Sequence, residues 1–297
     1  MTKNERIGLV TVTYNSGDVL EDFLASCWLQ DYPNFHLYIV DNASSDGTIA
    51  QLNKITDPRV TLILNDQNLG VAEANNQGIW SGLADACDSI LLINNDTTFP
   101  KDLITRLNDG ACKYNAEIVA PTMYYFDEPE KIWFGGGRFI PWRALQAAHE
   151  GYGIVDINNK YRTDKRITYA PTCCTLIHKN VFEKIGYMDE RYFVYYDDTD
   201  FFFRAWKANI VFFYLGTTKL FHKVSSLTGG HASRFTLKYM TRNRVIFLRK
   251  HTSSLMYLYS LAFMQVEFLY CLFKGLNTSS DYLYRQKYWV DGLKFKL

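Results

Sequence analysis

One carboxylate in the chain, Asp96, ends the most apolar strand-like run of the sequence and is followed by two threonines. A lone acid at such a point suits a hard divalent cation, because these ions take carboxylate oxygens and complete their coordination with water and substrate phosphates. The preceding Asn94 and Asn95 dilute the negative charge, so affinity for the bare ion is expected to be weak. The alternative is that Asp96 only closes a β-turn, where Asp is common.

A second acid, Asp41, also follows an apolar run and precedes a turn. Its carboxylate could accept hydrogen bonds from the edge of a nucleic base or from a ribose hydroxyl. The step Asp46-Gly47-Thr48 behind it resembles the entry to a helix, so one of these side chains can be explained as an N-cap. Similar polar clusters end three other apolar runs, at residues 13–15, 65–70 and 94–96.

A third group of acids, Asp197, Asp198 and Asp200, lies among aromatic residues. If these residues begin a helix, acids in the first turn offset the helix dipole. That role explains one or two acids. Three acids within four positions, beside aromatic side chains, exceed what capping requires and mark the segment as a candidate for chemistry.

The elements that must position these residues alternate between strands and helices over the first 120 residues. Apolar, β-branched runs at 7–13, 37–41, 60–64, 89–94 and 117–121 are separated by helical stretches. This βαβ pattern predicts an α/β fold with a mostly parallel sheet, covered by helices on both faces. Ligands of such sheets bind beyond the carboxyl ends of the strands. The polar clusters stand at those ends, so we expect them to converge on one site.

Charge is distributed unevenly over the 297 residues. The net charge is +1, but residues 231–297 hold eleven Lys and Arg against three Asp and Glu, so the rest of the chain is net negative. We therefore divide the chain into a main domain, residues 1–230, and a basic, aromatic-rich helical region, residues 231–297. Such a region suits an anionic surface, such as a cytoplasmic leaflet, or a phosphate-bearing substrate. A solvated helix face is the simpler alternative.

Residues 253–273 are almost wholly apolar, with Gln265 and Glu267 as the strongly polar exceptions. The length could just span a bilayer, but an acid near the centre is costly, and the Tyr and Phe content favours the interface. We therefore favour a helix on a membrane surface, or packed within the protein, over a span. The first residues show no apolar signal region, and the six cysteines lack CxxC spacing. These features predict a cytoplasmic protein held peripherally at the inner face of the cell membrane.

Several blocks, taken in order, resemble family 2 glycosyltransferases, especially their bacterial rhamnosyltransferase-like branch. The resemblance implies a GT-A fold, a nucleotide-sugar donor, Mg²⁺ or Mn²⁺ as the metal, and inversion at the anomeric carbon. The blocks are VTVTYNS, IVDNASSDGT, NLGVAEANNQGI, LLINNDTTF, the FGGG at 134–137, TCCTLIHKNVFEKIGYMDERYFVYYDDTDFFFRAWKANI and LFHKVSS.

The resemblance also assigns roles to individual residues. Asp96 takes the last position of the family's DxD-like motif and would bind the metal, and His222 would complete the metal site or touch the diphosphate. Many members carry Asp where this chain has Asn94. Because Asp96 is retained, this difference is expected to weaken the binding of the metal rather than to abolish the use of a metal. The implied substrate-binding residues are Thr13, Tyr14, Asn15 and Asp41 at the base and ribose, Asn42 and Asp46 beside them, Asn68, Gly70 and Asn76 on the nucleotide and sugar side, and Asn95, Trp133 and Arg204.

The segment beginning at Asp197 resembles a family pattern usually written with Glu-Asp, in which the second acid is the general base. Inverting transfer needs such a group, because the acceptor hydroxyl must lose its proton as it attacks from the face opposite the departing diphosphate. The resemblance therefore assigns the base to Asp198, with Asp197 as second candidate and Arg204 orienting the acids. Trp133, beside the close-approach turn of glycines 135–137, would be a stacking platform for a sugar.

Together these features predict an inverting, metal-dependent glycosyltransferase that moves a sugar from dTDP-rhamnose or a UDP-sugar to a bacterial surface-polysaccharide or lipid-linked glycan. Nucleic acid is not expected as a partner, and a homodimer is left open. An inactive nucleotide-binding scaffold within a polysaccharide assembly complex is the alternative, which would have no need of Asp96 and Asp198. A dehydrogenase or nucleotidyltransferase is disfavoured, because the chain has no GxGxxG after the first strand-like run and no GxxxxGK[ST].

Overall fold

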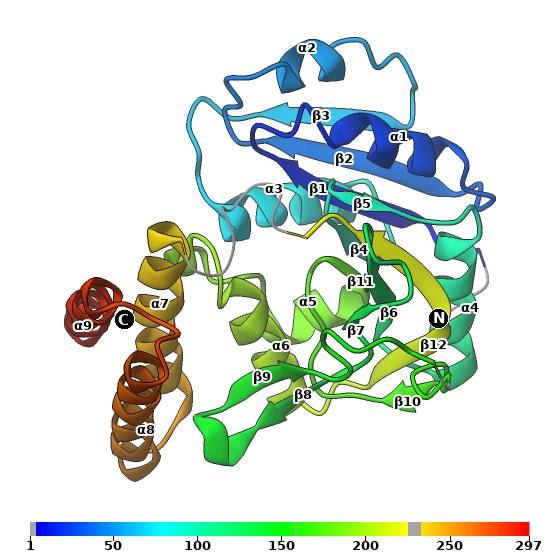
Figure 1. Ribbon diagram of the computed structural model, residues 1–297. Coiled ribbons are helices and arrows are strands. Elements are labelled where there is room, and N and C mark those ends of the chain that lie inside the picture. Colours follow the sequence, from blue (N-terminus) through cyan, green and yellow to red (C-terminus); the bar gives the residue numbers. More distant parts are fainter. Residues whose placement is uncertain (1–3, 158, 225–232, 297) are drawn as a thin grey trace.

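The computed structural model describes residues 4–157, 159–224 and 233–296. Over these residues the chain forms one large mixed sheet, with strand order β10-β12-β6-β11-β4-β1-β2-β3, and a separate two-stranded ribbon. Three helices near the C-terminus stand together at the side of the molecule away from β3 (Figure 1).

The first four long strands are parallel, as the apolar runs predict. They are β1 (Ile7–Thr13), β2 (Phe35–Asp41), β3 (Val60–Leu64) and β4 (Ser89–Ile93). In the β1–β2 register Thr13 stands opposite Asp41, so the two residues end their strands side by side. The polar clusters that follow these strands therefore meet at one edge of the sheet.

Helices cover both faces of these strands. The chain steps from β1 to β2 to β3 in one direction and returns past β1 to β4. Since crossovers between parallel strands are right-handed, α1 (Leu20–Trp28) and α2 (Thr48–Leu52) lie on one face and α3 (Val71–Ala84) on the other. Gly78 lets α3 approach the sheet closely, because a Cβ there would collide with the Val10 side chain.

The second half of the sheet was not anticipated in detail. Strand β11 (Cys174–His178) inserts antiparallel between β4 and β6 (Ile118–Tyr125), and β12 (Phe212–His222) runs parallel to β6. The shorter elements are α4 (Leu103–Tyr114), β5 (Thr97–Thr98), β7 (Ile132–Phe134), β8 (Gly137–Ile140), η1 (Pro141–Arg143), β9 (Gln146–His149), β10 (Lys165–Arg166), α5 (Lys179–Ile185), η2 (Glu190–Tyr192) and α6 (Asp197–Lys207).

The C-terminal region is helical, as predicted, and consists of α7 (Arg234–His251), α8 (Ser254–Phe273) and α9 (Ser279–Lys294). The division placed between residues 230 and 231 falls in the stretch 225–232, outside the described residues. Helix α7 buries its residues 245–248 in the same hydrophobic core as the sheet. It is therefore an integral part of the main body, whereas α8 buries few of its side chains.

Candidate active site

The ends of β1 and β2 form a polar cluster around Asp41, which is almost fully buried. Its Oδ1 accepts hydrogen bonds from the hydroxyls of Thr13 (2.7 Å) and Ser44 (2.6 Å), and its Oδ2 accepts one from the Ser44 backbone amide (2.9 Å). A carboxylate can accept about four hydrogen bonds, so Asp41 retains capacity for a further donor. This remaining capacity would suit an N–H or O–H group of a ligand.

Hydrogen bonds beside this cluster join the loops that follow β1 and β2. The Asn15 side chain accepts from the Ser45 amide (2.8 Å), and Asp46 accepts from the amides of Gly17 (3.0 Å) and Thr48 (2.9 Å) at the start of α2. Gly47 is the N-cap of α2 and has no side chain to cap it, and Asp46 instead fixes the turn that leads into the helix. The remaining predicted residues differ in exposure: Asn42 is buried and donates to the Gly70 carbonyl, whereas Tyr14 is 44% exposed.

The residues predicted for the sugar side are largely occupied by the protein itself. Asn68 accepts from the Gly70 amide (2.9 Å). The buried Asn76 exchanges hydrogen bonds with the backbone of Met188 and donates to Glu190. In this structure Asn76 therefore positions the segment after α5 rather than facing a ligand.

Asp96 and His222 are brought together by the pairing of β5 with the end of β12, in which Thr97 stands opposite His222. Their Oδ1 and Nε2 atoms are 3.2 Å apart, and both side chains are nearly buried. Burial lowers the pKa of His222, but the neighbouring Cys173 and Asp96 outweigh burial and raise it well above the usual value. Beside them Asn95 donates to the Val12 carbonyl (2.6 Å), which anchors the turn to β1.

The Asp96 carboxylate suits Mg²⁺ or Mn²⁺, and the His222 imidazole would add a nitrogen ligand once a bound metal displaces its proton. Among the described residues no group of three His, Cys, Asp or Glu side chains could hold an ion unaided. The two side chains would therefore hold a metal only together with water or with the phosphates of a bound nucleotide.

A row of aromatic rings connects this pair to the second group of acids. Trp133 makes edge contacts with His222 and with His149, with 4.7 Å between ring centroids in each case, and His149 stacks on Tyr169 at 5.8 Å. The Tyr169 hydroxyl then donates to Asp198 Oδ2 (2.8 Å). Burial lowers the pKa of His149 to about 4, so this imidazole is neutral near pH 7.

The turn at glycines 135–137, for which the sequence predicts a close approach, packs against Tyr169 and so fixes one end of this row of aromatic rings. A Cβ on Gly137 would collide with the carbonyl oxygen of Tyr169, and Gly136 has a φ of 110°. The turn therefore admits no larger side chain where it passes Tyr169.

Asp197 and Asp198 stand in the first turn of α6. Burial raises the pKa of Asp197, and the charge of Asp198 raises it further. Burial also raises the pKa of the half-buried Asp198, against the opposing hydrogen bonds from Tyr169 and Thr199. Carboxyl groups with raised pKa values are typical of sites of acid–base chemistry.

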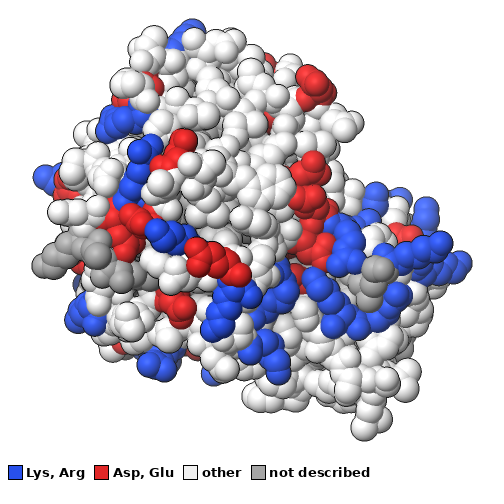
Figure 2. All heavy atoms as spheres, turned by 180° about the vertical axis from the view of Figure 1, so that it is seen from behind, with Lys and Arg blue, Asp and Glu red and all other residues white. Residues whose placement is uncertain are grey.

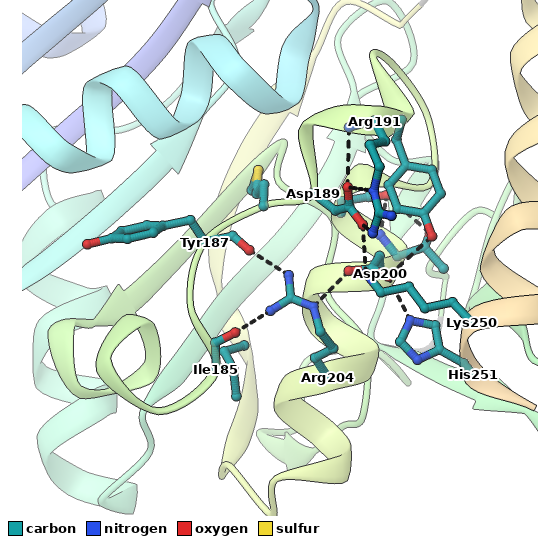
Figure 3. Close-up of polar contacts among 12 residues, drawn as sticks. Ile185, Tyr187, Asp189, Arg191, Asp200, Arg204, Lys250 and His251 are labelled. Carbon is teal, nitrogen blue, oxygen red and sulfur yellow. Dashed lines mark hydrogen bonds and ion pairs between the residues drawn. The ribbon is translucent and has the colours of Figure 1, made fainter. Parts of the chain in front are cut away.

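Asp200 differs from its neighbours, because it is fully buried and paired (Figure 3). It accepts from Arg204 of the same helix (2.7 Å), and from Lys250 (2.8 Å) and His251 (2.6 Å) of α7. Burial opposes ionisation, but these partners outweigh burial and hold the pKa of Asp200 well below its usual value. The other nitrogens of Arg204 donate to the carbonyls of Ile185 and Tyr187. Arg204 is therefore occupied with Asp200 and the backbone rather than with Asp197 or Asp198.

The segment that leads into Asp197 is strained. Phe193, Tyr195 and Tyr196 have φ angles of 64°, 60° and 69°, a region that bulky residues rarely adopt. Phe193 centres a γ-turn, in which the Val194 amide donates to the Tyr192 carbonyl (2.7 Å). Such conformations persist only where the surrounding contacts enforce them.

Two contacts enforce this conformation. The fully buried Asn243 of α7 directs its amide nitrogen at the carbonyls of Tyr192, Val194 and Tyr195, at 2.8 Å in each case. On the other side the Phe193 carbonyl accepts from the Val71 amide, where Gly70 has a φ of 88° and a Cβ would collide with Phe193. Gly70 and Asn243 therefore fix the backbone that presents Asp197 and Asp198.

Known proteins resemble this chain in sequence and in fold. The family model "Glycosyl transferase family 2" matches residues 9–186. The N-acetylglucosaminyl-diphospho-decaprenol L-rhamnosyltransferase of Mycobacterium tuberculosis is 27% identical, over 74% of this chain and 77% of its own length. The dTDP-rhamnosyl transferase RfbF of Shigella flexneri is 25% identical, over 84% of this chain and 81% of its own.

A solved structure has the same fold over almost the whole chain. The mannosyltransferase PcManGT from Pyrobaculum calidifontis, in complex with GDP-Man and Mn²⁺, superimposes with a TM-score of 0.59 and 16% identity, over 99% of this chain and 88% of its own. The predicted α/β class and GT-A fold are thereby confirmed. Because the family model covers more than half of its residues, the chain belongs to glycosyl transferase family 2.

Proposed function

We propose that the protein transfers a sugar, with inversion and with the help of a divalent metal, from dTDP-rhamnose or a UDP-sugar to a lipid-linked or surface-polysaccharide glycan. The observation that carries this proposal is the row of contacts from Asp96 and His222 through Trp133 to Tyr169 and Asp198. These contacts connect the pair that would bind a metal with a carboxylate whose pKa burial raises. An inactive scaffold would need neither group.

In the proposed reaction Asp198 accepts the proton of an acceptor hydroxyl as that oxygen attacks the anomeric carbon. Thr13 and Asp41 would hold the base and ribose of the donor, with Tyr14, Asn15 and Asn42 near them. Asp96 and His222 would hold the metal, which neutralises charge on the leaving diphosphate when bound. Trp133 would then lie between the metal side and the acid, where a sugar ring passes.

Two curated relatives favour rhamnose as the sugar, because both are rhamnosyltransferases by name. The test is a donor panel of dTDP-rhamnose, UDP-galactose, UDP-glucose, UDP-N-acetylglucosamine and GDP-mannose, assayed for nucleotide release with Mg²⁺ or Mn²⁺ and again with EDTA. Metal-dependent release from dTDP-rhamnose supports the proposal. Release from none of the donors in the presence of metal would refute it.

Replacing Tyr169 with Phe should move the acidic limb of the activity profile to higher pH. The Tyr169 hydroxyl stabilises the charged form of Asp198 and so opposes the burial that raises its pKa. Without that bond the pKa of Asp198 rises further, and a base acts only when deprotonated. We expect a shift of the kcat/KM limb by roughly one pH unit.

The measurement is the pH dependence of kcat/KM for Tyr169→Phe beside that for Tyr187→Phe. Tyr187 is 38% exposed, and its ring lies against Trp80 rather than against the acids. A limb that stays in place in Tyr169→Phe would mean that the titrating group is not Asp198.

We also propose that α8 attaches the protein to a membrane surface. Among the described helices, α8 is the one with the length and composition that a membrane crossing requires, although only 17% of its most apolar window is buried. Its buried residues, Ser260, Met264 and Phe268, form one narrow stripe. Both strongly polar residues also face the protein: Glu267 pairs with Arg244 of α7 (2.6 Å), and Gln265 accepts from Gln286 of α9 (2.6 Å). The outward side is left apolar, which suits a helix lying in the interface.

Replacing Leu269 and Phe273 together with Gln should weaken binding to anionic vesicles by at least about tenfold, because both side chains lose apolar contact with lipid. They are 51% and 88% exposed, so the fold should tolerate the change. The measurement is vesicle co-sedimentation at low and high salt. The control, Leu29→Gln with Leu64→Gln, changes exposed leucines in the part of the chain that precedes α3. Equal vesicle binding by the two double variants would contradict attachment through α8.

A further inference from the structure

A hollow of about 630 Å³ lies between α7 and α9, outside the site described above. Its volume is in the range of small-ligand pockets. Four of its eight lining residues are cations and one is an acid, so the charge that it presents is strongly positive. The lining residues are Lys238, Arg242, Gln286, Lys287, Tyr288, Val290, Asp291 and Lys294.

Within the part of the chain that the structure describes, carboxylates do not neutralise these cations. Over the described residues no ion pair involves Lys238, Arg242, Lys287 or Lys294. Viewed from behind, Lys and Arg atoms gather at the side where the C-terminal helices lie, next to a band of Asp and Glu (Figure 2). Unpaired cations in a concavity raise the local concentration of anions and favour phosphate-bearing ligands.

The walls of the hollow are fixed by close packing. Gly292 lets α9 lie against α7, because a Cβ there would meet the Val245 side chain and the Arg242 carbonyl. The Lys238 ammonium lies 5.6 Å from the centre of the Tyr288 ring, and the Arg242 guanidinium lies 5.2 Å from that of Phe295. The cations are therefore held by aromatic surfaces, with their charge left for a ligand.

The hollow adjoins the segment that presents the proposed base. Arg242 donates to the Arg191 carbonyl (2.9 Å), and Tyr239, one residue from Lys238, stacks on Phe193 with 5.3 Å between ring centroids. Phe193 belongs to the strained segment before Asp197. A ligand seated among these cations would therefore lie close to residues 191–193, a few residues before Asp197.

We propose that this hollow binds the diphosphate of a lipid-linked acceptor. The inference rests on the proposed function and adds the acceptor's anionic group to it. Helix α8, with its exposed apolar side, packs against both helices that line the hollow, so the cations and an apolar surface suited to an isoprenoid chain belong to the same three-helix group. The Mycobacterium relative, by its name, acts on a diphospho-decaprenol sugar, which is an acceptor of this chemistry.

The test is binding of farnesyl diphosphate in EDTA, so that a metal-bound diphosphate at Asp96 does not contribute. Lys238→Gln combined with Lys294→Gln should weaken binding by about tenfold, because each cation supplies a charge-assisted contact. The matched control, Lys184→Gln with Lys207→Gln, removes two exposed cations on α5 and α6 and should bind as the unaltered protein does. In transfer assays, the variant with Lys238→Gln and Lys294→Gln should have a higher KM for a lipid-linked diphosphate acceptor, and its rate of donor hydrolysis should be unchanged.

Each outcome decides the proposal. Equal farnesyl diphosphate binding by the hollow variant and the control would overturn it. Loss of binding to phosphatidylglycerol vesicles with unchanged farnesyl diphosphate affinity would mean that the hollow takes lipid headgroups, which also overturns it. Because the binding assay needs no turnover, failure of the proposed glycosyl transfer would appear separately, in the donor panel.

Discussion

Asp198→Asn is expected to bind the donor nucleotide normally while sugar transfer falls by roughly 10² to 10⁴, the usual contribution of a positioned base. Asparagine preserves the size of the side chain and can keep the contact with Tyr169, but it cannot accept a proton. Asp198 is half-buried at the start of α6, with one oxygen held by Tyr169 and the other by the Thr199 amide. The measurement is single-turnover transfer beside nucleotide affinity, both with metal at a fixed concentration.

Asp197→Asn is the informative comparison, because Asp197 is the adjacent acid and has a raised pKa of its own. We expect a smaller loss in this variant, since removing one of two neighbouring charges makes the other easier to ionise. If Asp197→Asn alone abolished transfer, the base would be Asp197. Weak nucleotide binding in Asp198→Asn would instead place Asp198 in the donor site.

Asp96→Ala should reduce turnover by at least about a hundredfold, because it removes the one carboxylate available to hold a metal against the diphosphate, and such electrostatic stabilisation is worth several kcal/mol. Asp96 lies 3.2 Å from His222, and the described residues offer no third protein ligand to compensate for its loss. The measurement is kcat as a function of Mn²⁺ and Mg²⁺ concentration.

The control for Asp96→Ala is Asp109→Ala, which removes an exposed acid of α4. It should keep near-normal turnover and the same metal dependence. Full activity of the unaltered protein in EDTA would contradict the metal role, as would near-normal turnover of Asp96→Ala.

The sequence predicts strands β1 to β4 well, because the apolar pattern that specifies each strand is local. Apolar β-branched runs specify β1 to β4, and parallel pairing then brings Thr13 next to Asp41 without further information. The proximity of Asp96 and His222 was predicted in a different way. His222 lies far from Asp96 in the chain, and only the resemblance connected them, since the short pairing of β5 with β12 leaves no periodic pattern.

Other contacts were missed because they depend on packing between distant segments. Tyr169, His149 and Asn243 are ordinary aromatic and amide residues in the sequence, and their importance comes from what they touch. For the same reason, Asn76 and Arg204 were expected at the substrate although the protein occupies their polar groups. A motif gives the type of side chain at a position, whereas the partner of that side chain is decided by the tertiary fold.

The hydrogen bonds from Asn243 to the strained segment before Asp197 affect the order in which the protein folds during synthesis. Asn243 lies 49 residues after Val194, so the segment leaves the ribosome before the side chain that holds it. Positive φ angles in bulky residues cost roughly 1 to 3 kcal/mol each, which the emerging chain cannot offset alone. Folding during synthesis would therefore form strands β1 to β4 first and arrange Asp197 and Asp198 last. A nascent chain halted before α7 would lack both Asn243 and the core residues 245–248, so Asp197 and Asp198 reach their final arrangement only after α7 has packed.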